Sequence, residues 1–127
     1  HVIVSKGRSD TPQLMQGADV CIHPAYRENT GLVILEAMAS ATPVLVTESC
    51  GYAQHVAKAH AGLVNPMPFN QSYFNQQWLT MRTSSEVQRQ SWSMNGLAYA
   101  KQLMEANDGS AEAIILIELA MRKKAGV

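Results

Sequence analysis

Short apolar runs alternate with helical stretches through the first half of the chain. The runs at residues 2–4, 20–23, 43–47 and 61–64 each have the length of a strand, and none alternates regularly with polar residues. Continuous apolar strands separated by helices are typical of a parallel sheet that is covered on both faces. We therefore expect an α/β fold with a partial, doubly wound, Rossmann-like parallel sheet.

Three segments between these strands have the features of helices. Thr11-Pro12 supplies a hydroxyl N-cap followed by proline at the first helical position, which predicts a short helix up to residue 18. The apolar stretch 32–40 predicts a second helix, and residues 52–59 predict a third.

From residue 70 onward the pattern is helical only. Asn70 can cap a helix, and Thr83 followed by Glu86 fits a capping box for a long helix over 84–106. Residues 108–110 end that helix, and 111–124 predict a last amphipathic one. The first of these helices has four expected core positions: Tyr73, Phe74, Trp78 and Leu79. We expect two units, residues 1–69 as the α/β part and 70–127 as helices that pack on it.

Composition excludes several classes of protein. Ten basic residues balance ten acidic ones, whereas a general nucleic-acid binder needs a basic surplus. Two cysteines are too few for a disulfide scaffold or a cysteine zinc site. No apolar run approaches the roughly 20 residues of a membrane span, and the first residues do not have the order of a signal peptide. The chain begins with His1, so we expect it to be part of a longer protein.

Glu36 is the only ionisable side chain between residues 31 and 47. A carboxylate in so apolar a run either lies on a thin solvated stripe of its helix, with Ser40 and Thr42, or has a specific partner or ligand. The sequence leaves both interpretations open.

The segment before this helix crosses from the end of a strand into the helix start. Ligands bind at such carboxyl ends in open α/β sheets, and the free N–H groups of a helix start suit a diphosphate. Gly31 permits close approach of the backbone. Glu28 and Glu36 would then flank the anion site, and carboxylates accept hydrogen bonds from sugar hydroxyls. This arrangement describes a nucleotide-sugar site.

The motifs in this region also resemble a known family. The Glu-x7-Glu spacing of Glu28 and Glu36 lies within HPAYRENTGLVILEAMASATPVLV, which is preceded by GRSDTPQLMQGADV and followed by ESCGYA and AGLV. Together these motifs resemble the carboxyl-terminal domain of retaining GT-B glycosyltransferases of family 4, most closely the glucosyltransferases of lipopolysaccharide core. The resemblance covers roughly residues 5–69 and implies that the α/β part is the distal portion of a nucleotide-sugar-binding domain.

The resemblance assigns roles to matching positions. Glu36 would hold the ribose hydroxyls, and Glu28 would contact the transferred sugar. The amides of Asn29, Thr30, Gly31 and Leu32 would face the diphosphate. Gly7 and Arg8 would lie near the base, and Gly51 and Tyr52 near the sugar or acceptor, although core packing is an equally good account of Tyr52. No residue is assigned a catalytic role, and no metal or other cofactor is implied, since the nucleotide-sugar is a substrate.

The sequence also departs from the family pattern. These enzymes use an arginine and a lysine on an earlier strand-helix unit to neutralise the leaving diphosphate, and the chain has no such pair after His1. The domain that binds the acceptor is also missing. We therefore expect this chain alone to be inactive in transfer, because the charge on the leaving group lacks its main partners.

The resemblance further implies partners and a location. The parent enzyme would transfer glucose from UDP-glucose to lipopolysaccharide inner core in the cytoplasm, as a peripheral protein at the inner membrane. Two strands of the family's sheet, between those at 2–4 and 20–23, are missing here. We therefore expect either direct re-pairing of the strands at 2–4 and 20–23 or a dimer through an open sheet edge. The alternative function is a non-catalytic nucleotide-binding or interaction module.

Overall fold

The computed structural model describes residues 17–24 and 32–124. The expected strand at 2–4 and the helix after Thr11 fall outside these residues, apart from Gly17 and Ala18, which are not helical. The described elements are, in chain order, β1 (Cys21–His23), α2 (Leu32–Ala39), β2 (Val44–Thr47), α3 (Ala53–Ala59), β3 (Gly62–Asn65), α4 (Gln71–Thr83), α5 (Glu86–Ala106) and α6 (Ala111–Lys124).

The three strands form one parallel sheet in the order β1-β2-β3. Leu45 at the middle of β2 lies opposite Ile22 on one side and Leu63 on the other. Each connection between strands contains a helix, as parallel pairing requires. The predicted α/β class with a helical tail is therefore confirmed.

Strand β2 is buried along its whole length and divides the core into two clusters. Val44 and Val46 pack with residues of α2, α3, α5 and α6. Leu45 points to the other face, where it packs with Phe74 and Met81 of α4. Helix α4 therefore covers one face, α2, α3 and α6 cover the other, and α5 contributes to both, which explains why the strand sequence is apolar throughout.

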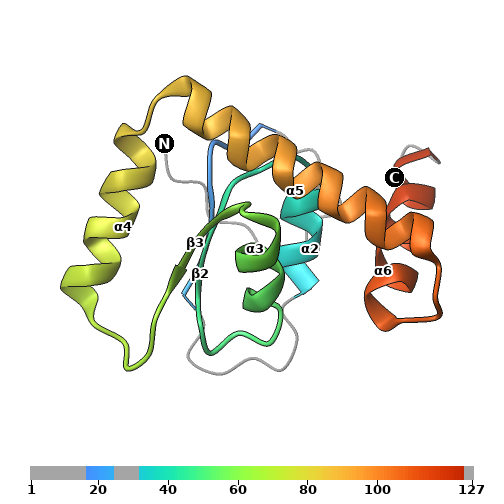
Figure 1. Cartoon of the computed structure of the whole chain (residues 1–127), viewed down its shortest axis with the longest axis horizontal. Coiled ribbons are helices and arrows are strands. Elements are labelled where there is room, and N and C mark those ends of the chain that lie inside the picture. The colour runs from blue at the N-terminus through green and yellow to red at the C-terminus, as the bar shows by residue number, and fades with distance from the viewer. Residues whose placement is uncertain (1–16, 25–31, 125–127) are drawn as a thin grey trace.

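Helix α5 runs across the molecule along the edge at which the strands begin (Figure 1). The Asn95 side-chain amide donates a hydrogen bond of 3.0 Å to the carbonyl of His60, two residues before β3. Asp19 and Pro43, just before β1 and β2, line a shallow groove together with Glu86 and Arg89 of α5. Helix α5 is therefore anchored at the amino ends of the strands, and it leaves the opposite edge clear.

A glycine lets α5 approach α2 closely. A Cβ atom placed on Gly96 would lie 3.3 Å from the Ala61 Cβ and 3.6 Å from the Met38 Cβ. Gly96 costs helix stability because of its backbone freedom. The close approach offsets that cost, since it buries α2 against the tail.

The helix boundaries partly follow the sequence prediction. The Asn70 side chain accepts a hydrogen bond from the Tyr73 amide, which confirms the predicted N-cap of α4. The capping box at Thr83 and Glu86 is wrong, because the cap of α5 is Ser85, whose hydroxyl accepts from the Gln88 amide at 3.1 Å. Thr83 instead ends α4.

The predicted apolar positions of α4 are only half right. Phe74 is buried and Trp78 is partly buried, whereas Tyr73 and Leu79 are 44% and 53% exposed. Gln77 and Met81 are the other inward positions. Tyr73 and Leu79 were predicted to be buried because they adjoin Phe74 and Trp78 in the sequence. Only one narrow face of α4 packs against the sheet, so these two side chains remain exposed.

Gly62 supports a first prediction about stability. Its φ is +155°, and a Cβ placed there would lie 1.8 Å from the carbonyl oxygen of Val44. Because that oxygen belongs to the central strand, it cannot move aside. We expect Gly62→Ala to lower the free energy of unfolding by at least about 3 kcal/mol, measured by urea unfolding.

Gly109→Ala is the matched control for this prediction. Gly109 has a φ of +81°, but nothing lies within 4 Å of a Cβ placed there. Its substitution should therefore cost only the backbone strain, about 1–2 kcal/mol. Equal losses in the two variants would contradict the proposed clash with Val44.

Candidate functional site

The carboxyl ends of the three strands meet at the edge of the sheet opposite α5. β1 ends at His23, β2 at Thr47 and β3 at Asn65. Because the strands are parallel, the segments that follow them lie side by side. Ligands of open α/β sheets bind at this edge, which makes it the candidate site.

The turn after β2 is held firmly at this edge. The Glu48 amide donates to the carbonyl of Asn65 at 2.8 Å, and the Cys50 amide donates to the carbonyl of Thr47 at 3.0 Å. The Ser49 hydroxyl donates to the Thr47 hydroxyl oxygen at 3.2 Å. Glu48 and Gly51 are exposed. The turn thus presents a carboxylate beside a glycine with no side chain to block approach, a combination that suits a ligand rich in hydroxyl groups.

A buried pair of amides connects the same edge to α4. The Asn65 amide nitrogen donates to the Gln77 Oε1 at 2.7 Å, and the Gln77 amide nitrogen donates to the carbonyl of Val64 at 3.2 Å. Asn65 is fully buried, and its Oδ1 has no hydrogen-bond partner. An unsatisfied buried acceptor costs about 1–3 kcal/mol. The pair fixes the end of β3 on α4 at that cost.

The structure describes only some of the residues predicted to form the site. Glu28, Asn29, Thr30, Gly31, Gly7 and Arg8 lie outside the described residues. Leu32 is the first residue of α2 and is 46% exposed. Gly51 lies in the exposed turn after β2. Tyr52 is buried in the core, with its ring edge-on to His55, as the packing alternative for this residue predicts.

Glu36 lies at the rim of an apolar cavity of about 200 Å³ between α2, α5 and α6. Apart from Glu36, Ser40 and Lys101, the cavity is lined by apolar side chains: Ala39, Leu97, Ala100, Met104, Leu116, Leu119 and Ala120. Glu36 is half-buried, so its environment lies between the two alternatives that the sequence left open.

The Glu36 carboxylate also acts on Cys21 of β1. Burial, with a further contribution from the Glu36 charge, raises the pKa of the Cys21 thiol from the ordinary 9.0 to about 11. The helix therefore places Glu36 near the strand that leads toward the expected diphosphate segment. Cys21 is partly buried, and its raised pKa keeps the thiol in its protonated, less nucleophilic form at neutral pH.

Among the residues that the structure describes, no three histidine, cysteine, aspartate or glutamate side chains gather as metal ligands would. Within the same part of the chain, no helix is both long enough and apolar enough to cross a membrane.

The sequence reasoning missed Glu48, Ser49 and Asn65 as candidate site residues. A signal for them was present, because Glu48 and Ser49 directly follow the apolar run 43–47 and Asn65 follows 61–64. Residues placed directly after parallel strands are candidates by position alone.

Comparisons with known proteins identify the family of this chain. Residues 1–96 match the family described as "Glycosyl transferases group 1". The chain belongs to this family, and the resemblance to GT-B glycosyltransferases is confirmed.

The individual relatives are more specific. The chain is 43% identical over 94 residues to the lipopolysaccharide glucosyltransferase WaaG of Escherichia coli K12, covering 74% of this chain and 25% of that protein. It is 39% identical over 51 residues to the D-inositol 3-phosphate glycosyltransferase of Streptomyces bingchenggensis, covering 40% and 11% of the two chains.

A solved structure shows the same arrangement. The crystal structure of WaaG, described as a glycosyltransferase involved in lipopolysaccharide biosynthesis, superimposes with a TM-score of 0.75 at 35% identity. The match covers 90% of this chain and 29% of that one. The chain thus spans between a quarter and a third of the length of WaaG.

The alkylation rate of the Cys21 thiol tests whether Glu36 lies near it. At pH 8 a pKa of about 11 leaves roughly a hundredfold less thiolate than a pKa of 9.0, so Cys21 should alkylate slowly with iodoacetamide. Glu36→Gln removes the nearby negative charge and should speed alkylation of Cys21 severalfold, followed by peptide mass spectrometry. Glu105→Gln, an exposed change on α5, is the control. Equal Cys21 rates in all three proteins would contradict the proximity of the two groups.

Proposed function

We propose that this chain is the donor-binding portion of a retaining glucosyltransferase that transfers glucose from UDP-glucose to lipopolysaccharide inner core. The single observation that carries the proposal is the 43% identity to WaaG over 94 residues. That stretch covers most of the chain, and WaaG is described as a lipopolysaccharide glucosyltransferase.

The physical arrangement supports donor binding at the carboxyl edge of the sheet. Helix α2 follows β1. The N–H groups in the first turn of a helix have no carbonyl partner within the helix and can therefore donate to a ligand. A diphosphate is stabilised at such a helix start by these donors and by the helix dipole. The donor would therefore lie across the start of α2, with its diphosphate at the amides of residues 29–32.

Carboxylates on either side would recognise the two sugars of the donor. Glu36, one turn into α2, would accept hydrogen bonds from the ribose hydroxyls, and Glu28 would accept from the glucose. Each such bond to a charged acceptor contributes about 1.5–3 kcal/mol. Glu48 and Gly51 on the neighbouring turn would line the sugar side.

Binding and transfer should be separable in this chain. The positive partners that neutralise a leaving diphosphate supply most of the electrostatic stabilisation in such transfers. The sequence after His1 offers no arginine–lysine pair of the family's kind. We expect this chain to bind UDP-glucose without turning it over, and expect transfer only in a longer protein that supplies those groups and the acceptor domain.

An NMR titration tests donor binding directly. UDP-glucose added to the ¹⁵N-labelled chain should produce saturable shifts at the amides of residues 32–36 and 47–51. Glu36→Gln should weaken binding about 10- to 100-fold, because it replaces a charged acceptor by a neutral one of similar shape. Glu105→Gln should bind like the unchanged chain.

Two results would contradict this proposal. One is the absence of any saturable shift at millimolar UDP-glucose in a chain whose spectrum shows it to be folded. The other is equal affinity of the unchanged chain and Glu36→Gln, which would remove Glu36 from the donor site. ADP-glucose in the same titration distinguishes recognition of the uridine from recognition of the diphosphate.

A further inference from the structure

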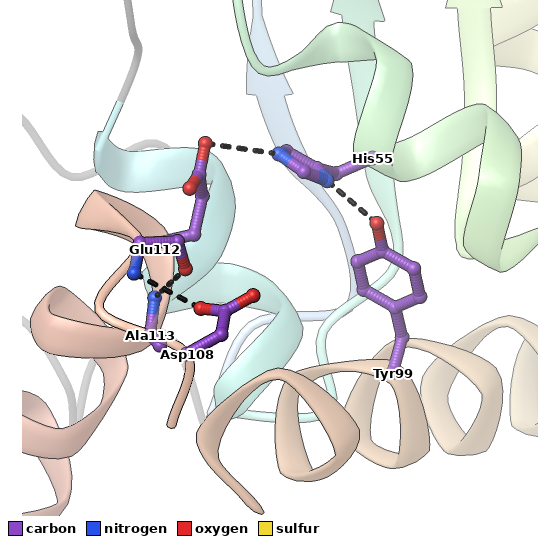
Figure 2. A network of polar contacts seen from close by, with 6 residues as sticks. His55, Tyr99, Asp108, Glu112 and Ala113 are labelled. Carbon is purple, nitrogen blue, oxygen red and sulfur yellow. Dashed lines mark hydrogen bonds and ion pairs between the residues drawn. The ribbon is translucent and has the colours of Figure 1, made fainter. Parts of the chain in front are cut away.

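A buried histidine in the first turn of α3 lies where three helices meet. His55 of α3 is 6% exposed and faces Tyr99 of α5 and Glu112 of α6 (Figure 2). Its Nδ1 lies 2.6 Å from the Tyr99 hydroxyl oxygen, and its Nε2 lies 3.8 Å from the Glu112 Oε1. The Nε2 atom is buried and has no hydrogen-bond partner. The His55 ring thus connects α3 to both α5 and α6.

The contacts define the form of the ring at neutral pH. Burial, with a smaller contribution from Glu112, raises the pKa of Tyr99 above its ordinary value, so its hydroxyl keeps its proton. The hydroxyl can then donate to Nδ1, which leaves the ring proton on Nε2, facing the Glu112 carboxylate. A second proton on the ring would turn Nδ1 from an acceptor into a donor, so the Tyr99 hydroxyl could no longer donate its proton to the ring.

Helix α6 is joined to α5 by a connection that can act as a hinge. Asn107 and Gly109 both have positive φ values, 39° and 81°. The start of α6 is capped from within this connection. The Ser110 hydroxyl accepts from the Ala113 amide at 3.2 Å, and the Asp108 carboxylate accepts from the Ser110 amide at 2.9 Å. Because its cap is local, α6 can move away without losing its first turn.

We propose that His55 is a proton-sensitive latch, whose neutral ring holds α6 on α3 and α5 and whose protonation loosens α6 from them. The charged ring would be left in a buried junction beside a tyrosine hydroxyl that no longer has its acceptor. Movement of α6 would open the junction and let water reach the ring. None of the three side chains of the latch lies in a strand, so the sheet should remain folded.

The charges around the ring give the direction of the effect. Burial lowers the pKa of His55 below 6.5. The negative charge of Glu112 on α6 raises this pKa, and the positive charge of Lys58, which lies on α3 like His55, lowers it further. Tyr52 and Tyr99, the other titratable groups beside the ring, stay neutral because their pKa values are raised. Since the docked state has the lower pKa, docking is strongest above pH 6.5 and weakens as the pH falls below it.

Hydrogen exchange at individual amides tests the latch in this chain. Between pH 7.5 and 5.0, after correction for intrinsic rates, protection of the amides of 114–121 should fall severalfold, because protonation of His55 favours the state in which α6 is released. Amides of β2 and β3 should keep their protection. His55→Phe should abolish the pH dependence, whereas His60→Asn should keep it, because His60 is exposed and asparagine tolerates its left-handed backbone.

Two milder variants keep the proposal testable if His55→Phe fails to fold. Tyr99→Phe removes the donor to the neutral ring, which raises the pKa of docked His55 and should shrink the acid loss. Glu112→Gln removes the charge that favours the protonated ring, which lowers that pKa further and should enlarge the loss. Opposite changes in these two variants are the signature of titration at His55.

Three outcomes would overturn the proposal. The first is equal α6 protection at both pH values. The second is parallel loss in α6 and the sheet, which would mean global destabilisation rather than release of one helix. The third is an acid response that is unchanged in His55→Phe or that moves in the same direction in both milder variants.

Discussion

The structure depends on the contact between the central strand and its neighbour. Val44 of β2 and Gly62 of β3 lie so close that no side chain fits between them, and this contact sets the register along the rest of the pair. β2 then supplies Val46 to one core cluster and Leu45 to the other. Because burial of apolar surface is the main driving force for folding, both layers of helices depend on the placement of this one strand.

Much of this fold could be predicted from local sequence, because its signals are local. Each described strand was visible as an apolar run, and α6 was placed at its observed bounds. The predictions that were wrong share one cause: they depend on contacts between elements rather than on local sequence. Ser85 rather than Thr83 caps α5, since two helices meet within a few residues and several hydroxyls compete for one role. Tyr73 and Leu79 are exposed because the sheet offers α4 only a narrow surface.

For the candidate site, too, some features could be predicted from the sequence and others depend on tertiary contacts. Glu36 could be found from sequence, because one carboxylate in an apolar run is conspicuous and its spacing from Glu28 follows a family pattern. The pairing of Asn65 with Gln77 could not, because it joins a strand end to the middle of a helix across the sheet's face. The cavity beside Glu36 was equally hidden, since α5 and α6 form most of its wall.

Helix α5 is the one helix of the described part that contributes to both core clusters, through Trp92 and Ala100. Its 21 residues span about 31 Å, enough to cross a small domain. It crosses at the edge where the strands begin, while the loops of the candidate site extend from the opposite edge. Changes in those loops therefore need not disturb the packing that α5 secures. Such a division lets ligand preference diverge among related chains while their stability stays nearly constant.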